Sequence, residues 1–155
     1  MTEKTQQEMV KLLGGIEMFQ EFDEAELGEM AALLKEQNYE SGREILKEGD
    51  PGGELFIIAD GSVEVQKSRS HGAGRIVIAR FEKGGVIGEM SLVDRMPRSA
   101  SITTARPTKM YIISQEALDN LTTAKPQVAI KFLKGLARLL SLRLRNTSGW
   151  FADVF

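Results

Sequence analysis

The feature that most constrains this chain is a change in the period of its apolar residues. Between residues 42 and 113, short runs rich in Ile, Val, Phe and Thr follow the two-residue period of β-strands. These runs are REILKEGD, ELFIIADG, SVEVQKS, RIVIARF, SITTA and KMYII, separated by turn signals such as GDPGG, SHGAG and KGG. Many short strands joined by regular turns predict an antiparallel sandwich or a roll closed on itself.

Helical periods flank this strand region on both sides. In FDEAELGEMAALL, Asp23 is suited to be an N-cap with Glu26 three residues later, a variant of the capping box. The apolar residues that follow have the spacing of one helix face: Leu27, Met30, Ala31 and Leu34. After the strands, Ser114 can cap a short helix, and Pro126 suits the first turn of a longer one.

These patterns predict one domain that covers residues 1–155. We expect N-terminal helices over about 3–35, the β-roll over about 42–113 and C-terminal helices over about 115–145. The fold class is therefore α+β and mainly β, with a jelly-roll-like antiparallel body between helical ends.

The last predicted helix, PQVAIKFLKGLARLLSLRLR, has two apolar stripes. One consists of Leu133, Leu136, Leu140 and Leu144, and the other of Val128, Phe132, Leu139 and Leu142. A helix that packs only on its own domain needs one stripe, so the second must cover a pocket or meet another chain. We expect a homodimer through this helix, with Leu139 and Leu142 on the surplus stripe.

Composition excludes several classes of site. The chain has no cysteine and a single histidine, His71, so disulfides, thiolate or multi-histidine metal sites and Cys nucleophiles are excluded. Its net charge of −2 does not suggest a nucleic-acid-binding surface. No export signal or membrane span is recognisable, which predicts a cytoplasmic protein without membrane contact. No metal or other cofactor is expected.

One segment, GEMSLVDRMPRSAS at residues 88–101, interrupts the alternation and carries its own chemistry. Arg98 is followed by Ser99 and Ala100, which are too small to block an approaching phosphate, and a guanidinium matches phosphate oxygens bidentately. Glu89 only accepts hydrogen bonds when ionised, so it suits a sugar hydroxyl. A carboxylate for ribose, with an arginine and backbone amides for phosphate, indicates a nucleotide site.

The same segment resembles the phosphate-binding cassette of cyclic nucleotide-binding domains. VIGEMSL at 86–92 and PRSAS at 97–101 match the two halves of that motif with the expected spacing. The resemblance extends to MFQEFDEAELGEMAALL and to YESGREILKEGDPGGELFIIADGSVEV, and it covers about residues 16–145. It implies an eight-stranded β-roll flanked by helices, as in catabolite activator proteins and protein kinase regulatory subunits.

The resemblance also implies site roles. Glu89 would bind the ribose 2′-hydroxyl with the Gly88 amide assisting, and Arg98 would pair with the cyclic phosphate. The implied ligand-binding set is Gly88, Glu89, Met90, Ser91, Arg98, Ser99 and Ala100. A serine at position 99 is usual in cAMP binders, whereas threonine there favours cGMP, so cAMP is the expected ligand and cGMP the second candidate.

Two departures from the family are visible. Ile87 stands where an aromatic residue often precedes the cassette glycine. The winged-helix DNA-binding domain of catabolite activator proteins is absent, so we expect no direct DNA binding and a separate effector protein.

On the last helix, Arg143 and Leu144 stand where those activators place small hydroxyl residues against adenine, and Leu139 and Arg143 are the candidate lid residues. The tail from Trp150 to Phe155 would cap the base or bind a partner.

Three function classes stay open at this point. The first is a sensor in which a cyclic nucleotide changes the position of the last helix and so signals to a partner. The second is an enzyme on a β-roll, which the lack of a metal cage or a Ser-His-Asp arrangement disfavours. The third is a degenerate cassette that binds no nucleotide and serves as a protein-interaction module. The sequence favours the first, a non-enzymatic sensor.

Overall fold

The computed structural model describes residues 1–154, with side chains through residue 147. It divides into two compact units, a helical unit of residues 1–32 and 118–155 and a roll unit of residues 33–117. The two units are described separately, and the single-domain expectation stays a prediction. None of the described helices combines the length and the apolar character that crossing a bilayer requires.

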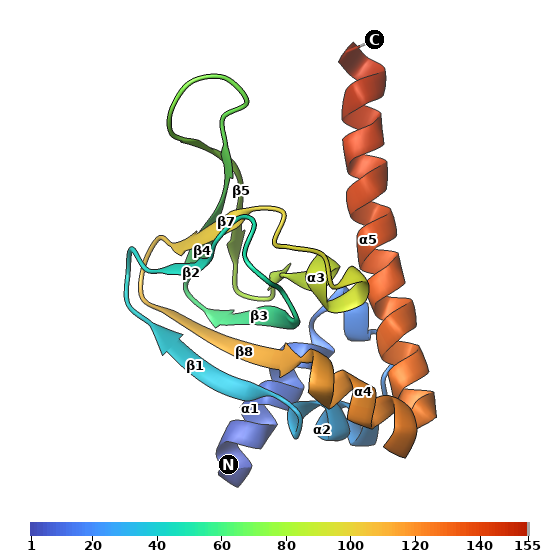
Figure 1. The fold of residues 1–155 in the computed structure, drawn as a ribbon. Coiled ribbons are helices and arrows are strands. Elements are labelled where there is room, and N and C mark those ends of the chain that lie inside the picture. The colour runs from blue at the N-terminus through green and yellow to red at the C-terminus, as the bar shows by residue number, and fades with distance from the viewer. Residues whose placement is uncertain (155) are drawn as a thin grey trace. The chain divides into compact units, whose positions relative to one another are not determined.

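The roll unit consists of two four-stranded antiparallel sheets (Figure 1). The strand order of the first sheet is β1 (Lys35–Tyr39), β8 (Thr108–Ser114), β3 (Glu54–Asp60) and β6 (Val86–Ile87). The order of the second is β2 (Glu44–Leu46), β7 (Ser101–Thr104), β4 (Ser62–Ser68) and β5 (Arg75–Glu82). A short helix, α3 (Glu89–Asp94), follows β6. This confirms the mainly β, jelly-roll-like fold class with eight antiparallel strands and helices at both ends.

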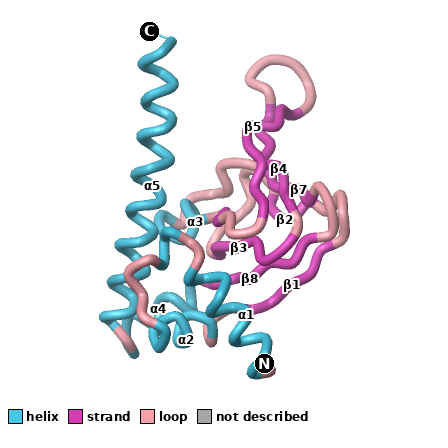
Figure 2. The backbone as a smooth tube through the Cα atoms, turned by 180° about the vertical axis from the view of Figure 1, so that it is seen from behind, coloured by secondary structure: helices cyan, strands magenta, loops and turns pink. Residues whose placement is uncertain are grey.

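The core of the roll is formed by side chains from both sheets. Its buried members are Leu46, Phe56, Ile58, Val63, Ile87, Ile102 and Met110. Strand β3 lies between β8 and β6, and α3 packs beside it (Figure 2). The start of β3 and the turn before it are therefore close to the start of α3, which places the 88–101 segment against the first sheet.

The helical unit contains α1 (Glu3–Gly14), the 3₁₀ turn η1 (Glu17–Phe19), α2 (Glu24–Ala31), most of α4 (Gln115–Ala124) and α5 (Pro126–Val154). The capping box predicted for α2 is present, because the Glu26 N–H donates to Asp23 Oδ1 at 2.8 Å and the Asp23 N–H to Glu26 Oε1 at 3.1 Å. Ser114 caps α4 through the Ala117 N–H, and Pro126 is the first residue of α5, as expected.

Helix α5 packs closely against η1 through a glycine. A Cβ at Gly135 would lie 2.0 Å from the Met18 carbonyl oxygen, and Phe132 is fully buried with its ring 6.2 Å from that of Phe19. Lys131 forms an ion pair with Glu26 at 2.7 Å. This hydrogen-bonded pair raises the pKa of Lys131 and lowers that of Glu26. Apolar and ionic contacts thus hold the first half of α5 to the N-terminal helices.

The structure corrects the predicted stripes of α5. Its buried face combines Val128 and Phe132 from one predicted stripe, Leu136 from the other, and Ala129 from neither. Leu139 is half-buried and Leu142 is 40% exposed. The apolar residues that are exposed along most of the helix form another row. This row is Ile130, Leu133, Ala137, Leu140 and Leu144, and all of them are exposed except Leu140, which is half-buried. The surplus stripe is therefore mainly the one that was expected to face the core, because α5 approaches η1 at Gly135.

Several predicted boundaries were also wrong. Residues 35–39 form β1, where the sequence predicted the end of the N-terminal helices, and α2 ends at Ala31. Strand β1 is polar and mostly exposed, so its sequence shows no alternation of apolar and polar residues. Its pairing with β8 defines it as a strand. Strand β6 has only two residues, and the sequence patterns predicted neither this strand nor the helix α3 that follows it. Helix α5 extends to Val154 rather than to about residue 145.

We predict that Gly135→Ala lowers the free energy of unfolding by about 1–3 kcal/mol, the usual cost of overpacking, because the new Cβ meets a backbone oxygen that cannot rotate away. Gly28→Ala is the matched control, since its Cβ would approach nothing closer than Gln6 Nε2 at 3.9 Å. That variant gains about 0.5–1 kcal/mol from helix propensity. Urea denaturation measures both, and equal stabilisation of the two variants would contradict the contact.

Candidate functional site

The 88–101 segment begins at a glycine that no other residue could replace. Gly88 has left-handed backbone angles, φ 75° and ψ 9°, and immediately precedes α3. A Cβ there would lie 2.8 Å from Arg98 Nη1 and 2.8 Å from the Glu54 carbonyl oxygen. Both the backbone conformation and the lack of space therefore require glycine. The close approach brings the start of α3 against the guanidinium of Arg98.

Arg98 is buried inside the roll, with only 6% of its surface exposed. Its Nη1 donates to the carbonyl oxygens of Glu54 at 3.0 Å and Gly88 at 3.3 Å. Its Cζ lies 5.9 Å from the centre of the Phe56 ring, within the range of a cation–π contact. The guanidinium is thus fixed between β3 and the start of α3.

Two opposing effects act on the pKa of Arg98. Burial lowers its pKa from its ordinary value, while the charges of Glu54 and Glu89 act in the opposite direction. Its Nε has no hydrogen-bond partner among the described residues, although it is buried. A buried donor without an acceptor is costly and needs an explanation. An anion bound beside the guanidinium would supply the missing acceptor.

The acidic and hydroxyl residues of the cassette are also buried. Glu89, the first residue of α3, is 7% exposed, and its charge is favourable at the positive end of a helix. Ser91 is 4% exposed, and its Oγ donates to the Met96 carbonyl oxygen at 3.1 Å. The structure therefore brings the predicted carboxylate and guanidinium into one buried cluster and holds the loop after α3 in place.

The remaining predicted residues lie further out. Met90 is 48% exposed, and the Ser99 hydroxyl lies 3.8 Å from its sulfur. Ala100 is half-buried next to them. The candidate lid residues Leu139 and Arg143 are half-buried on α5, in the other unit, so their role stays a prediction. The predicted cap from Trp150 to Phe155 lies outside the described side chains.

The sequence profile of the cyclic nucleotide-binding domain matches residues 36–125, more than half of the chain. The chain belongs to the cyclic nucleotide-binding domain family. Among solved structures, a cyclic nucleotide-binding domain from Methylobacillus flagellatus KT aligns with a TM-score of 0.86 and 31% identity, over 98% of this chain and 85% of that one. The catabolite activator protein of Thermus thermophilus aligns at 0.78 with 28% identity, over 88% and 62%.

Two curated relatives are regulators. The cAMP-dependent protein kinase regulatory subunit of Mycosarcoma maydis is 27% identical over 90% of this chain. A CRP-like cAMP-activated global transcriptional regulator of Mycobacterium tuberculosis is 26% identical over 94%. The chain spans 25% of the first relative's length and 63% of the second's. The activities and partners of those whole proteins are therefore not assigned to this chain.

The contacts that hold the cassette in this family member include residues that sequence reasoning missed. Glu54 contributes a backbone oxygen to Arg98 beside that of the predicted Gly88, and Gly49 and Asp50 bind the backbone of Arg98. A carbonyl oxygen carries no residue-type signal, so only the GDPGG turn, in which Gly49 and Asp50 stand, could have indicated this layer. Phe56 lies in a predicted strand, and in the structure it belongs to the core and also contacts the guanidinium.

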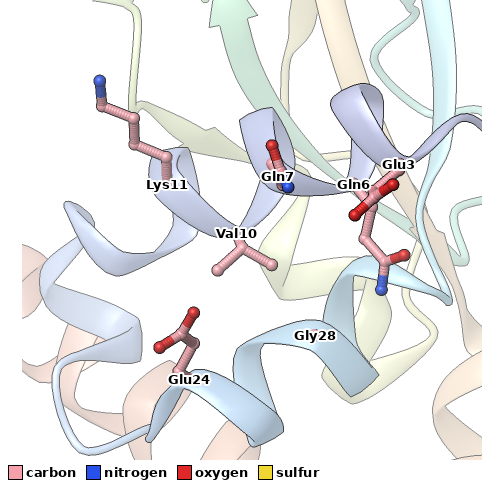
Figure 3. Close-up of a pocket in the computed structure, with 7 residues that line it drawn as sticks. All are labelled: Glu3, Gln6, Gln7, Val10, Lys11, Glu24 and Gly28. Atoms are coloured by element: carbon pink, nitrogen blue, oxygen red, sulfur yellow. The ribbon is translucent and has the colours of Figure 1, made fainter.

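A separate groove of about 450 Å³ lies between α1 and α2 (Figure 3). Its lining is Glu3, Gln6, Gln7, Val10, Lys11, Glu24 and Gly28, none of which belongs to the cassette. Carboxylates and carboxamides predominate, and Val10 is its one large apolar side chain, unlike the mostly apolar lining of small-molecule sites. We assign no ligand to it.

Proposed function

We propose that this chain is a cyclic nucleotide sensor with cAMP as its preferred ligand and cGMP as the second candidate. The observation that carries the proposal is the buried Arg98, whose Nε has no acceptor among the described residues while Glu89 is buried nearby on α3. Serine at position 99 and the cAMP-dependent names of the two regulators support cAMP. In this proposal the chain binds and signals and does not catalyse.

Isothermal titration of the purified protein against cAMP, cGMP and a cyclic dinucleotide tests the proposal. Tighter binding of cAMP than of cGMP is the expected result. The alternative function is a degenerate cassette that acts as a nucleotide-independent interaction module. Binding of none of the three ligands by the folded protein would overturn the sensor and support that alternative.

Arg98 is the proposed anchor of the cyclic phosphate. A charge-assisted hydrogen bond contributes about 1.5–3 kcal/mol, and each ~1.4 kcal/mol is tenfold in affinity. Arg98→Ala should therefore weaken cAMP binding roughly ten- to a hundredfold, and Arg98→Lys, which keeps a nitrogen donor without the fork, by less. Arg106→Ala is the control, because Arg106 binds the Gly61 carbonyl elsewhere in the roll. Circular dichroism checks folding, and parent-like affinity in folded Arg98→Ala would refute the anchor.

Glu89 is the proposed acceptor of the ribose 2′-hydroxyl. We predict that the parent protein binds a 2′-deoxy analogue more weakly than cAMP, because that analogue lacks the hydroxyl that would donate to the buried carboxylate. Glu89→Gln should discriminate less between the two ligands. Titration calorimetry with both ligands measures this difference. If the parent does not distinguish them, the role of Glu89 is to shape the loop.

We also propose a homodimer through α5. The exposed row on α5, Ile130, Leu133, Ala137, Leu140 and Leu144, alternates steps of three and four residues, the spacing of a coiled-coil seam. In this proposal the dimer forms mainly through a different face of α5 from the one that carries Leu139 and Leu142. Ligand would act by favouring one pre-existing arrangement of α5, which a separate effector protein reads. The absence of direct DNA or membrane binding and the cytoplasmic location stay predictions.

Paired variants on two faces of α5 test the dimer. Leu133→Glu with Leu140→Glu should give a monomer at micromolar concentration in sedimentation velocity, because two buried charges per chain would have no partners. Leu139→Glu with Leu142→Glu is the matched control on the other face and should leave the dimer intact. A monomeric parent would refute the dimer, and the reverse result would move the interface to Leu139 and Leu142.

A further inference from the structure

The turn before β3 holds Arg98 at its backbone as well as its side chain. The Gly49 N–H donates to the Arg98 carbonyl oxygen at 2.9 Å, and the Arg98 N–H donates to the Asp50 carbonyl oxygen at 2.8 Å. At the start of β3, the Glu54 carbonyl oxygen accepts from Arg98 Nη1. Residues 49–54 therefore fix both ends of Arg98, so a displacement of this turn moves the guanidinium.

Gly52 lies in the middle of this turn and faces the cassette. A Cβ there would lie 2.2 Å from Ser91 Cβ, 2.4 Å from Ser91 Oγ and 3.3 Å from Arg98 Nε. Carbon atoms in contact are normally about 3.5–4.0 Å apart. The space between the turn and α3 thus holds one Cβ only, and Ser91 occupies it. Ser91 is itself held by its hydrogen bond to Met96.

We propose that Gly52 is a positioning residue for Arg98. The missing side chain lets Ser91 and the Nε of Arg98 approach the turn together, which sets the direction in which the guanidinium points. A side chain at position 52 displaces α3 through Ser91 and the guanidinium through Nε. The consequence for ligand affinity rests on the proposed function, whereas the geometric coupling of Gly52, Ser91 and Arg98 does not.

The first test is an exchange of the single Cβ between the two positions. We expect Gly52→Ala to weaken cAMP binding at least tenfold in titration calorimetry. Gly52→Ala combined with Ser91→Gly should bind within about threefold of Ser91→Gly alone, since the exchange frees the occupied space. In an Arg98→Ala background, Gly52→Ala should change affinity less than twofold. The matched control is Gly28→Ala, which should bind as the parent does.

The second test needs no ligand. In the ligand-free protein, the Nε–H of Arg98 should give a ¹H–¹⁵N signal that exchanges slowly with solvent, because Nε is buried. Gly52→Ala should shift this signal and speed its exchange at least tenfold, and the added Ser91→Gly should reverse both changes. A merely structural glycine would leave this signal in place in folded protein.

The outcomes separate the two proposals. An unchanged Nε–H signal in folded Gly52→Ala overturns the positioning role, whatever the affinity. A loss of affinity that is equally large in the Arg98→Ala background also overturns it, because the glycine then acts by general destabilisation. If the parent binds no cyclic nucleotide but the signal responds as expected, the positioning role stands and the sensor function fails.

Discussion

The structure of the roll is organised around a guanidinium that has been taken out of water. Burying a charge costs several kcal/mol even after relaxation, so the surroundings must offset that cost. For Arg98 this comes from two backbone carbonyl oxygens, from the Phe56 ring and from the nearby charges of Glu54 and Glu89. Arginine keeps its charge under such conditions because its pKa is so high, which lysine would not guarantee.

The hydrogen bonds that offset the burial of Arg98 are incomplete, because its Nε–H has no acceptor among the described residues. A guanidinium has five N–H donors, and the Nε–H of Arg98 meets no acceptor in the described part of the chain. A structural ion pair would use the fork fully, whereas a binding site must leave part of it to the ligand. The left-handed Gly88 and the turn at 49–54 keep this group in place. In the proposed function, the cassette is therefore preorganised for an anion before one arrives.

The structural features that the sequence predicted correctly are those that depend on side-chain type. The capping box of Asp23 and Glu26 and most strands of the roll follow from local residue patterns, and the structure confirms them. The layer that positions Arg98 was not predictable, because it consists of backbone oxygens and of the missing Cβ of Gly52. Strand β1 was missed for a related reason: it is polar and mostly exposed, and its ladder with β8 defines it.

The same distinction, between features set by side-chain type and features set by backbone contacts, explains which faces of α5 are buried. Up to Gly135, its faces are determined by contacts within the helical unit: the close approach to Met18, the packing of Phe132 on Phe19 and the ion pair of Lys131 with Glu26. A heptad-like row can be read from sequence, but which row is exposed depends on where a neighbouring backbone passes. Gly135 decides this, because a helix turns its smallest residue toward its closest neighbour. Leu133 and Leu144 on the opposite face are then exposed, and apolar surface left in water costs about 25 cal/mol per Å².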